Sequence, residues 1–322
     1  MPVRKDGFSA KMKLSLSTNW CNRRIESGEE IADKAMELGF AELELGYHTT
    51  LLQAKGFKAR LDQIPVGSVH AFCPVPISAP QGYPELYALA SFDEEDRKMA
   101  KLMIGRNIKF AADMGADTVV LHAGRIGFGN FFDRIDTAKL KEVFKAGDHR
   151  ADDSKYAKLY ARASKRRQAR GRKMLDIFMR ELDALVPVLE KNKVTLALDN
   201  LPYLEGFPND GELMQLITRF QHAPIRGWFD TGHARVCEMH GWGKTVFNDQ
   251  AASAREFYAG MHLNDVEAFD DDHLAPGDGN VDFAALKVFA ENVRHVVFEP
   301  NSGVKEEELR KGLAFIRGLW LP

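Results

Sequence analysis

The sequence predicts a (β/α)8 barrel, which is a closed ring of eight parallel strands with helices between them. Eight short apolar runs recur along the chain, separated by segments with helical periodicity. The runs are almost continuously apolar, as is typical of parallel strands covered on both faces. Eight such units in 322 residues fit one barrel. A doubly wound open sheet is the alternative, but no glycine-rich phosphate fingerprint follows the first run.

The eight runs have the length of strands and should follow one another around the barrel. They span residues 13–18, 41–45, 66–72, 117–122, 194–198, 225–229, 258–263 and 295–299. Segments such as SGEEIADKAMEL and VKEEELRKGLAFIRGL place apolar residues every three or four positions and are predicted helices. We expect residues 1–12 to form a flexible leader and residues 13–322 to form a single barrel domain.

The connection between the fourth and fifth runs is longer than the others, at about 70 residues. Its segment 139–173 holds thirteen Lys or Arg against four Asp or Glu, and much of it has helical periodicity. We therefore predict a long basic helical insertion at this point. One interpretation is a solvated helix that protects solubility. The other is a surface for phosphate-bearing partners, because clustered cations attract polyanions.

The overall composition limits the classes of partner. The formal net charge is −2, so the average surface favours neither nucleic acid nor membranes, although the basic insertion could still bind a polyanion. No apolar run reaches the roughly 18 residues that cross a bilayer. The three cysteines form no CxxC pair, which favours a reducing cytoplasm over a disulfide-bonded exterior. A small polar molecule is the expected ligand, and a homo-oligomer is left open.

Metal-binding side chains follow the predicted strands. Six of the eight runs end in such a residue: His70, His122, Asp199, Asp230, His262 and Glu299. Three more lie on the loops that follow: His233, Asp271 and His273. Each has a structural explanation when taken alone, such as a hydrogen-bonded histidine or a helix cap. Because the carboxyl ends of barrel strands meet at one mouth, we expect the set to surround bound metal.

The residue types indicate which metal would bind. Histidines with carboxylates and no thiolate suit Zn or Mn, with Co, Fe or Mg as alternatives, better than a calcium site built from oxygen alone. The full set is too large for a single ion and would hold two or three with Asp199 as the bridging ligand, whereas a single ion would use only part of the set; one to three ions are therefore expected. His149, His222, His240 and His295 lie outside the strand-end pattern and are interpreted as structural.

Five motifs give the chain a resemblance to a known superfamily: LHAG at 121–124, FDTGHA at 229–234, HLND at 262–265, GDGNVDF at 277–283 and FEPN at 298–301. With these motifs the chain resembles the xylose isomerase-like TIM barrels, which include sugar and sugar-phosphate isomerases and epimerases and the endonuclease IV type of abasic-site nuclease. The resemblance implies a barrel with a metal site at its mouth.

The two branches of this superfamily imply different ligand sets. The epimerase-like members imply a compact site made by Asp199, Asp230, His262 and Glu299, in which two carboxylates also move protons. The nucleases imply three zinc ions held by all nine residues named above. In both branches the fifth-strand ligand is usually glutamate, so Asp199 is one methylene shorter than the resemblance predicts.

The resulting functional prediction is a metal-dependent sugar or sugar-phosphate isomerase or epimerase. Asp199 and Glu299 are the predicted catalytic residues, which would transfer a proton alpha to a carbonyl. Further predicted contacts to the carbohydrate substrate are Trp20, Phe72, Arg125 and Asn200. The alternatives are a zinc phosphodiesterase acting on abasic DNA and a non-catalytic barrel that binds metal.

Overall fold

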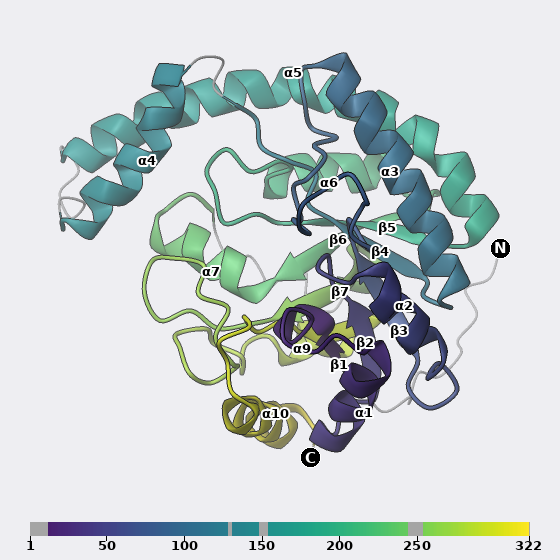
Figure 1. Ribbon diagram of the computed structural model, residues 1–322. Coiled ribbons are helices and arrows are strands. Elements are labelled where there is room, and N and C mark those ends of the chain that lie inside the picture. Colours follow the sequence, from purple (N-terminus) through teal and green to yellow (C-terminus); the bar gives the residue numbers. More distant parts are fainter. Residues whose placement is uncertain (1–11, 128–130, 148–153, 244–253, 322) are drawn as a thin grey trace, which may run out of the picture.

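A computed structural model describes residues 12–127, 131–147, 154–243 and 254–321, so nearly all of the predicted leader lies outside the described residues. Eight parallel strands pair in sequence order and close into a barrel, which confirms the predicted fold (Figure 1). The strands are β1 (Leu14–Ser17), β2 (Glu42–Leu45), β3 (Val66–His70), β4 (Thr118–Leu121), β5 (Thr195–Asp199), β6 (Ile225–Asp230), β7 (Tyr258–Leu263) and β8 (His295–Phe298).

Helices surround the barrel, and several begin at side-chain caps that the sequence supplies. Ser27, Thr50, Asp93 and Asn209 each accept a hydrogen bond from a backbone N–H in the first turn of the following helix. The helices are α1 (Gly28–Leu38), α2 (Leu51–Lys58), α3 (Glu94–Asp113), α4 (Phe131–Lys145), α5 (Lys155–Asn192), α6 (Asp210–Arg219), α7 (Thr231–Met239), α8 (Ala254–Phe257), α9 (Lys287–Glu291) and α10 (Glu306–Trp320), with the 3-10 helix η1 at Thr18–Trp20.

Side chains fill the barrel interior in layers. Trp228, Val120, Ala197 and Val297 form one fully buried cluster that spans β4, β5, β6 and β8. The indole of Trp228 needs space on β7, where a Cβ on Gly260 would lie 2.5 Å from the ring. Since side chains alternate along a strand, the residue two positions beyond each of these points inward as well, one layer closer to the mouth.

The predicted basic insertion, residues 139–173, covers the second half of α4 and the first half of α5, and Figure 1 shows these helices extending along one side of the barrel; residues 148–153, with His149, lie outside the described residues. It is not wholly a solvated surface. Arg167 of α5 is buried and forms a two-point ion pair with Glu212, with two N–O distances of 2.7 Å. Phe144 of α4 packs on Phe269, with ring centroids 4.8 Å apart. The insertion therefore supports the loop after β7.

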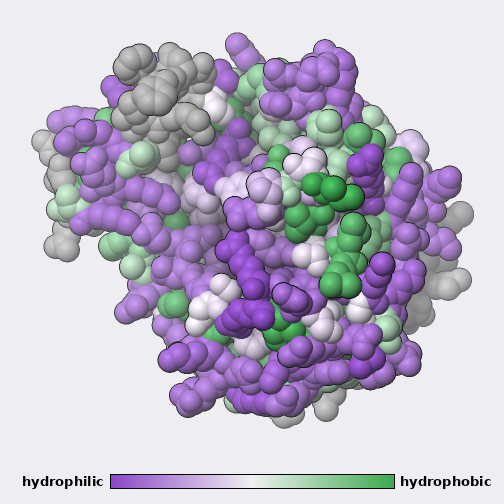
Figure 2. Space-filling model, viewed as in Figure 1, coloured by the Kyte–Doolittle hydropathy of each residue, from purple (hydrophilic) through white to green (hydrophobic). Residues whose placement is uncertain are grey.

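The outer surface in Figure 2 is mostly hydrophilic and is interrupted by small apolar clusters. Among the described residues, no helix has both the length and the apolar character that crossing a bilayer requires.

Candidate metal centre

The predicted ligands converge at one end of the barrel because of strand periodicity. Val120, Ala197, Trp228 and Val297 lie in the buried layer, and the residue two positions after each is a predicted ligand. These ligands are His122, Asp199, Asp230 and Glu299. His70 and His262 occupy the same end of β3 and β7. All six are less than 10% exposed, so the strands place a polar layer directly above the apolar one.

Three carboxylates surround a single nitrogen of His262. Its Nδ1 lies 3.1 Å from Glu299 Oε2, 3.5 Å from Asp230 Oδ2 and 3.6 Å from Asp199 Oδ2. His262, Asp199 and Asp230 are completely buried. A cation at this point could therefore be bound by oxygen and nitrogen together.

The other predicted ligands extend the cluster toward the mouth. Asp271 lies between two histidines, with its oxygens 3.3 Å from Nε2 of His233 and 3.3 Å from Nε2 of His273. His122 Nε2 lies 3.4 Å from Asp199 Oδ2, and the rings of His70 and His122 are 5.0 Å apart between centroids. All nine predicted ligands thus form one connected group. Ligand atoms from His70, His122 and Asp199 lie within 4.8 Å of one another, as do those from Asp230, His233 and His273.

Backbone carbonyls hold three of the histidines by the ring nitrogen that faces away from the cluster. The Nδ1 atoms of His70, His233 and His273 lie 2.9, 2.6 and 2.8 Å from the carbonyl oxygens of Ala71, Asn200 and Glu299. A carbonyl can only accept, so Nδ1 carries the proton and Nε2 of a neutral ring keeps its lone pair for the cluster. Such outer hydrogen bonds are typical of histidines that bind metal.

Buried polar atoms without partners support the fit of a metal ion. Among the described residues, both carboxylate oxygens of Asp199, Nδ1 of His262 and Oδ1 of Asp271 form no hydrogen bond. Leaving such groups unpaired in a protein interior typically costs about 1 to 3 kcal/mol each. A donor set of imidazoles and carboxylates suits Zn, Mn, Fe or Co. The residues present therefore fit a divalent cation.

Burial and mutual charge shift the pKa values of the cluster in opposite directions. Burial lowers the pKa of His70 to about 3, and the charge of His122 adds to this effect. Burial also opposes protonation of His233, but Asp230 and Asp271 outweigh it and raise its pKa to about 10. Burial raises the pKa of Glu299, whereas the nearby imidazoles of His122 and His262, at 3.4 and 3.6 Å, outweigh burial and lower the pKa of Asp199. The two predicted catalytic carboxyls thus differ in affinity for a proton.

The motif FDTGHA places two ligands at the junction of β6 and α7. Asp230 ends the strand and caps the helix, since its Oδ1 accepts a hydrogen bond from His233 N at 2.8 Å. Its Oδ2 accepts one from Asn264 Nδ2, also at 2.8 Å. A Cβ on Gly232 would lie 1.8 Å from Asn264 Oδ1, so only glycine fits this turn. These contacts fix the orientation of Asp230.

Asp265 organises the loop that carries Asp271 and His273. Its carboxylate accepts backbone hydrogen bonds at 2.9 Å from Val266, Gly277, Gly279 and Val281. Asp265 and Leu274 also exchange backbone hydrogen bonds in an isolated bridge. The motifs HLND and GDGNV are therefore two sides of one folded loop, which explains why two cluster residues can project from it in fixed positions.

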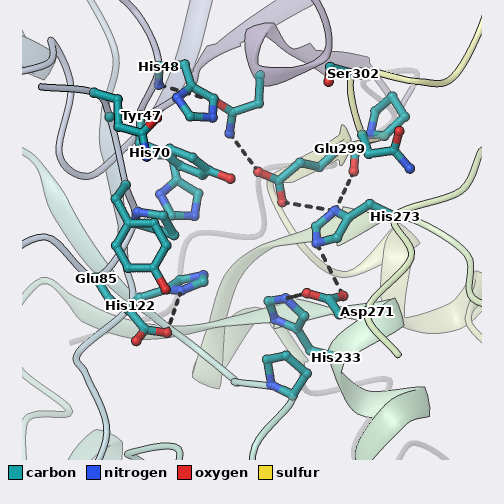
Figure 3. Close-up of a pocket in the computed structure, with 18 of the residues that line it drawn as sticks. Tyr47, His48, His70, Glu85, His122, His233, Asp271, His273, Glu299 and Ser302 are labelled. Carbon is teal, nitrogen blue, oxygen red and sulfur yellow. Dashed lines mark hydrogen bonds and ion pairs between the residues drawn. The ribbon is translucent and has the colours of Figure 1, made fainter. Parts of the chain in front are cut away.

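A cavity of about 370 Å³ opens above the cluster. Figure 3 shows Tyr47, His70, His122 and Glu85 along one side and Glu299, His273, Asp271 and His233 along the other. Asp199, Asp230 and His262 are fully buried and do not line the cavity. The cavity has the volume of a pocket for a small ligand.

The predicted substrate contacts lie away from this cavity or are already paired. Trp20 is buried and donates a hydrogen bond to Val304 O at 2.7 Å, and Phe72 is buried against Tyr87. Asn200 holds the backbone of Asp230 through hydrogen bonds of 2.8 and 3.1 Å. None of these three side chains lines the mouth cavity.

Arg125 lies near the mouth, but its charge already has a partner. Its guanidinium contacts Glu85 through two nitrogens at 2.7 and 3.1 Å and stacks on the ring of Tyr203 at 3.4 Å. The carboxylate of Glu85 also approaches His122 Nδ1 at 3.9 Å. In this arrangement Arg125 balances Glu85 rather than presenting a free charge to an anion.

Sequence reasoning missed Glu44 and Asn19, which contact the cluster from β2 and from η1. Glu44 is fully buried beside His262, and Asn19 Nδ2 donates to Glu299 Oε1 at 3.0 Å. The signal for Glu44 was present, because a carboxylate inside the short strand ELEL must either face solvent or pair inside the barrel. On the inner face of a barrel strand a carboxylate cannot face solvent, so it must pair inside the barrel.

The chain belongs to the xylose isomerase-like TIM barrel family, whose sequence profile matches residues 32–319. This agrees with the resemblance inferred from the motifs. No curated protein matches the chain by sequence.

Solved structures with similar folds include several sugar epimerases. A D-tagatose 3-epimerase-like protein has a TM-score of 0.62 and 19% identity over 95% of this chain and 99% of its own. The 3-keto-D-glucoside 4-epimerase YcjR of E. coli has a TM-score of 0.64 and 17% identity over 96% and 100%. A D-psicose 3-epimerase from Clostridium cellulolyticum H10 has a TM-score of 0.62 and 15% identity over 96% and 99%. At this identity the likeness establishes a shared fold.

Proposed function

We propose that this protein is a metal-dependent sugar or sugar-phosphate isomerase or epimerase. The observation that carries the proposal is the approach of Asp199, Asp230 and Glu299 to within 3.1 to 3.6 Å of His262 Nδ1. A small carbohydrate would fit the cavity above this point, and the sugar epimerases of the same fold support that choice of substrate.

Asp199 and Glu299 would transfer the proton. They come from β5 and β8, which are not neighbours in the barrel, so the two carboxylates reach the centre from different sides. One can then remove a proton alpha to a carbonyl, and the other can return a proton from the other side. Asn19 holds Glu299 in place through its hydrogen bond of 3.0 Å. A bound divalent cation would polarise the carbonyl and the adjacent hydroxyl.

A second candidate is a metal-dependent phosphodiesterase. The specific observation in its favour is that His70, His122, His233, Asp271 and His273 join the same cluster, which provides more ligands than one cation uses. In this interpretation the nine residues together would hold more than one cation. The substrate would be a phosphodiester, such as the backbone of abasic DNA.

The two candidates are separated by activity with defined metals. Protein loaded with Mn, Co or Zn is incubated in deuterated water with a panel of ketoses and ketose phosphates, and deuterium at carbon is followed by NMR. We expect label to enter a substrate and its epimer or isomer. If a zinc-loaded sample instead cuts a duplex with an abasic site and leaves every sugar unlabelled, the phosphodiesterase is correct and the isomerase proposal fails.

Variants then test the assigned residues. Asp199→Asn and Glu299→Gln should each lower turnover by roughly 10²- to 10⁴-fold, the usual contribution of a general acid or base. Asp117→Asn is the matched control, since Asp117 is a carboxylate at the opposite end of the barrel beside His295. Turnover by the control should equal that of the wild type. Equal losses in all three variants would argue against a specific role for the two mouth carboxylates.

A further inference from the structure

A carboxylate that belongs to none of the predicted ligand groups lies directly behind His262. Glu44 is fully buried on β2, and its two oxygens are 3.0 and 3.2 Å from His262 Nε2. Ser68 Oγ of the neighbouring strand β3 donates to Glu44 Oε2 at 2.8 Å and fixes the carboxylate. Glu44 therefore occupies the side of the imidazole that faces away from Asp199, Asp230 and Glu299.

This placement selects one tautomer of His262. A neutral imidazole carries a proton on one nitrogen only, and a carboxylate can only accept a hydrogen bond. Proximity to Glu44 therefore keeps the proton on Nε2 and leaves the lone pair on Nδ1. That lone pair faces the three carboxylates, as a metal ligand must. The other tautomer would set the lone pair of Nε2 against the oxygens of Glu44.

The partner of His262 also differs in charge from those of the other histidines. The Nδ1 atoms of His70, His233 and His273 bind neutral carbonyl oxygens at 2.6 to 2.9 Å, and carboxylate oxygens approach those of His233 and His273 only to 3.8 and 4.0 Å. The carboxylate near His122 is 3.9 Å away and is shared with Arg125. An anionic partner makes an imidazole a stronger electron donor than a neutral one does. Nδ1 of His262 should thus be the strongest imidazole donor of the cluster.

We propose that Glu44 is a positioning residue that orients His262 and makes the position beside His262 Nδ1 the tightest metal position of the cluster. The inference rests on the proposed metal-dependent function. It adds a prediction of which bound cation the protein retains most tightly. A cation beside His262 should remain when a chelator has removed any cation held between Asp271 and His273.

The test compares Glu44→Gln with a matched variant on the same strand. Glutamine keeps the size and can still accept from Nε2, but it lacks the negative charge. Glu42→Gln makes the same change two residues earlier, beside His295 at the opposite end of the barrel. Mn or Zn affinity is measured on the full chain by competition with a chelator, and the stoichiometry is followed as chelator is added. The tautomer of His262 is assigned from ¹⁵N chemical shifts of the imidazole.

We expect Glu44→Gln to weaken the tightest site by about 10- to 100-fold, as is typical when the outer partner of a metal-binding histidine is changed. Glu42→Gln should leave that affinity unchanged. In the wild type, His262 should be protonated on Nε2 alone when metal is bound. A purely structural role for Glu44 would lower stability and leave both the affinity and the ¹⁵N shifts unaltered.

Other results would overturn the inference. If Glu44→Gln binds the tight ion as the wild type does, the inference fails while the proposed function can still stand on the sugar assay. If the wild type binds no divalent cation, both fail together. Should Glu44→Gln not fold, Glu44→Asp retains the charge with a shorter reach and should weaken the tight site by a smaller factor, and unchanged affinity in that variant would also count against the inference.

Discussion

His262 and His295 lie on neighbouring strands and pack against the same indole, yet their surroundings differ. Trp228 packs edge-on against His262 and stacks on His295, with ring centroids 5.0 and 6.1 Å apart. His295 has a carboxylate at each nitrogen, Asp117 at 2.9 Å and Glu42 at 3.4 Å. His262 has one nitrogen beside Glu44, and the other forms no hydrogen bond within the described part of the chain.

The carboxylates beside His295 and those at the mouth of the barrel also differ in how many hydrogen bonds they form. Near His295, Glu42 also accepts from Ser15 at 3.0 Å, and Asp117 accepts from Thr118 at 2.9 Å and pairs with Arg294. At the mouth, neither oxygen of Asp199 forms a hydrogen bond with any described residue. Both ends concentrate titratable groups, so their density does not identify a metal site. The mouth differs because its buried cluster keeps ligand atoms unpaired, and this difference supports the proposed metal site.

The largest effect expected from this comparison is stabilisation by metal. At a free metal concentration about 1,000-fold above the dissociation constant, loading should raise the free energy of unfolding by about 4 kcal/mol. Asp199→Ala should abolish most of that gain, because Asp199 lies within 3.6 Å of both His122 and His262. Urea unfolding with and without metal measures the difference.

His295→Gln is the control for that experiment. It changes the other polar end of the barrel, so its gain on metal loading should equal that of the wild type. An equal gain in Asp199→Ala would remove the distinction between the two ends, since the unpaired oxygens at the mouth would then not be metal ligands.

The alternation of side chains along the strands explains which features of the barrel could be predicted from the sequence. The inward-facing positions of β4, β5, β6 and β8 follow from alternation, and the fold and the strand-end ligands could be predicted from it. The segment ELEL indicates that Glu44 pairs inside the barrel, but it does not identify His262 as the partner, because the two residues are 218 positions apart and meet only across the closed barrel. The orientations of the Trp20 and Phe72 side chains also depend on packing. Both residues lie just beyond strand ends, where the alternation of side chains along a strand no longer specifies which way they point.

A smaller effect on the free energy of unfolding is expected when His295 is replaced, and this effect should depend on pH. Burial opposes protonation of His295, but Asp117 and Glu42 outweigh burial and raise its pKa, while the pKa values of the two carboxyls are lowered. Stability from the raised histidine is complete below its unfolded pKa of about 6.5 and is lost as pH rises through the folded value. Stability from the carboxyls is present above about pH 4 and is lost as pH falls through their folded values.

The contribution of the His295 network should therefore be largest between about pH 4.5 and 6.5. His295→Gln should lower the free energy of unfolding by about 2 kcal/mol in that window and by less at pH 9. Denaturant unfolding of metal-free protein across the pH range measures the difference. A loss that does not vary with pH would mean that His295 stabilises the barrel as a neutral ring.

The smallest expected effect is the energetic coupling between the polar groups at the mouth of the barrel and those at the opposite end, beside His295. Asp117→Asn and Asp271→Asn change carboxylates below and above the Trp228 layer, and the two side chains share no partner among the described residues. Their effects on the free energy of unfolding should add to within about 0.5 kcal/mol in a double-mutant cycle on metal-free protein. A coupling above about 1 kcal/mol would show that the apolar layer transmits charge or strain, and the two ends would then have to be treated as a single network.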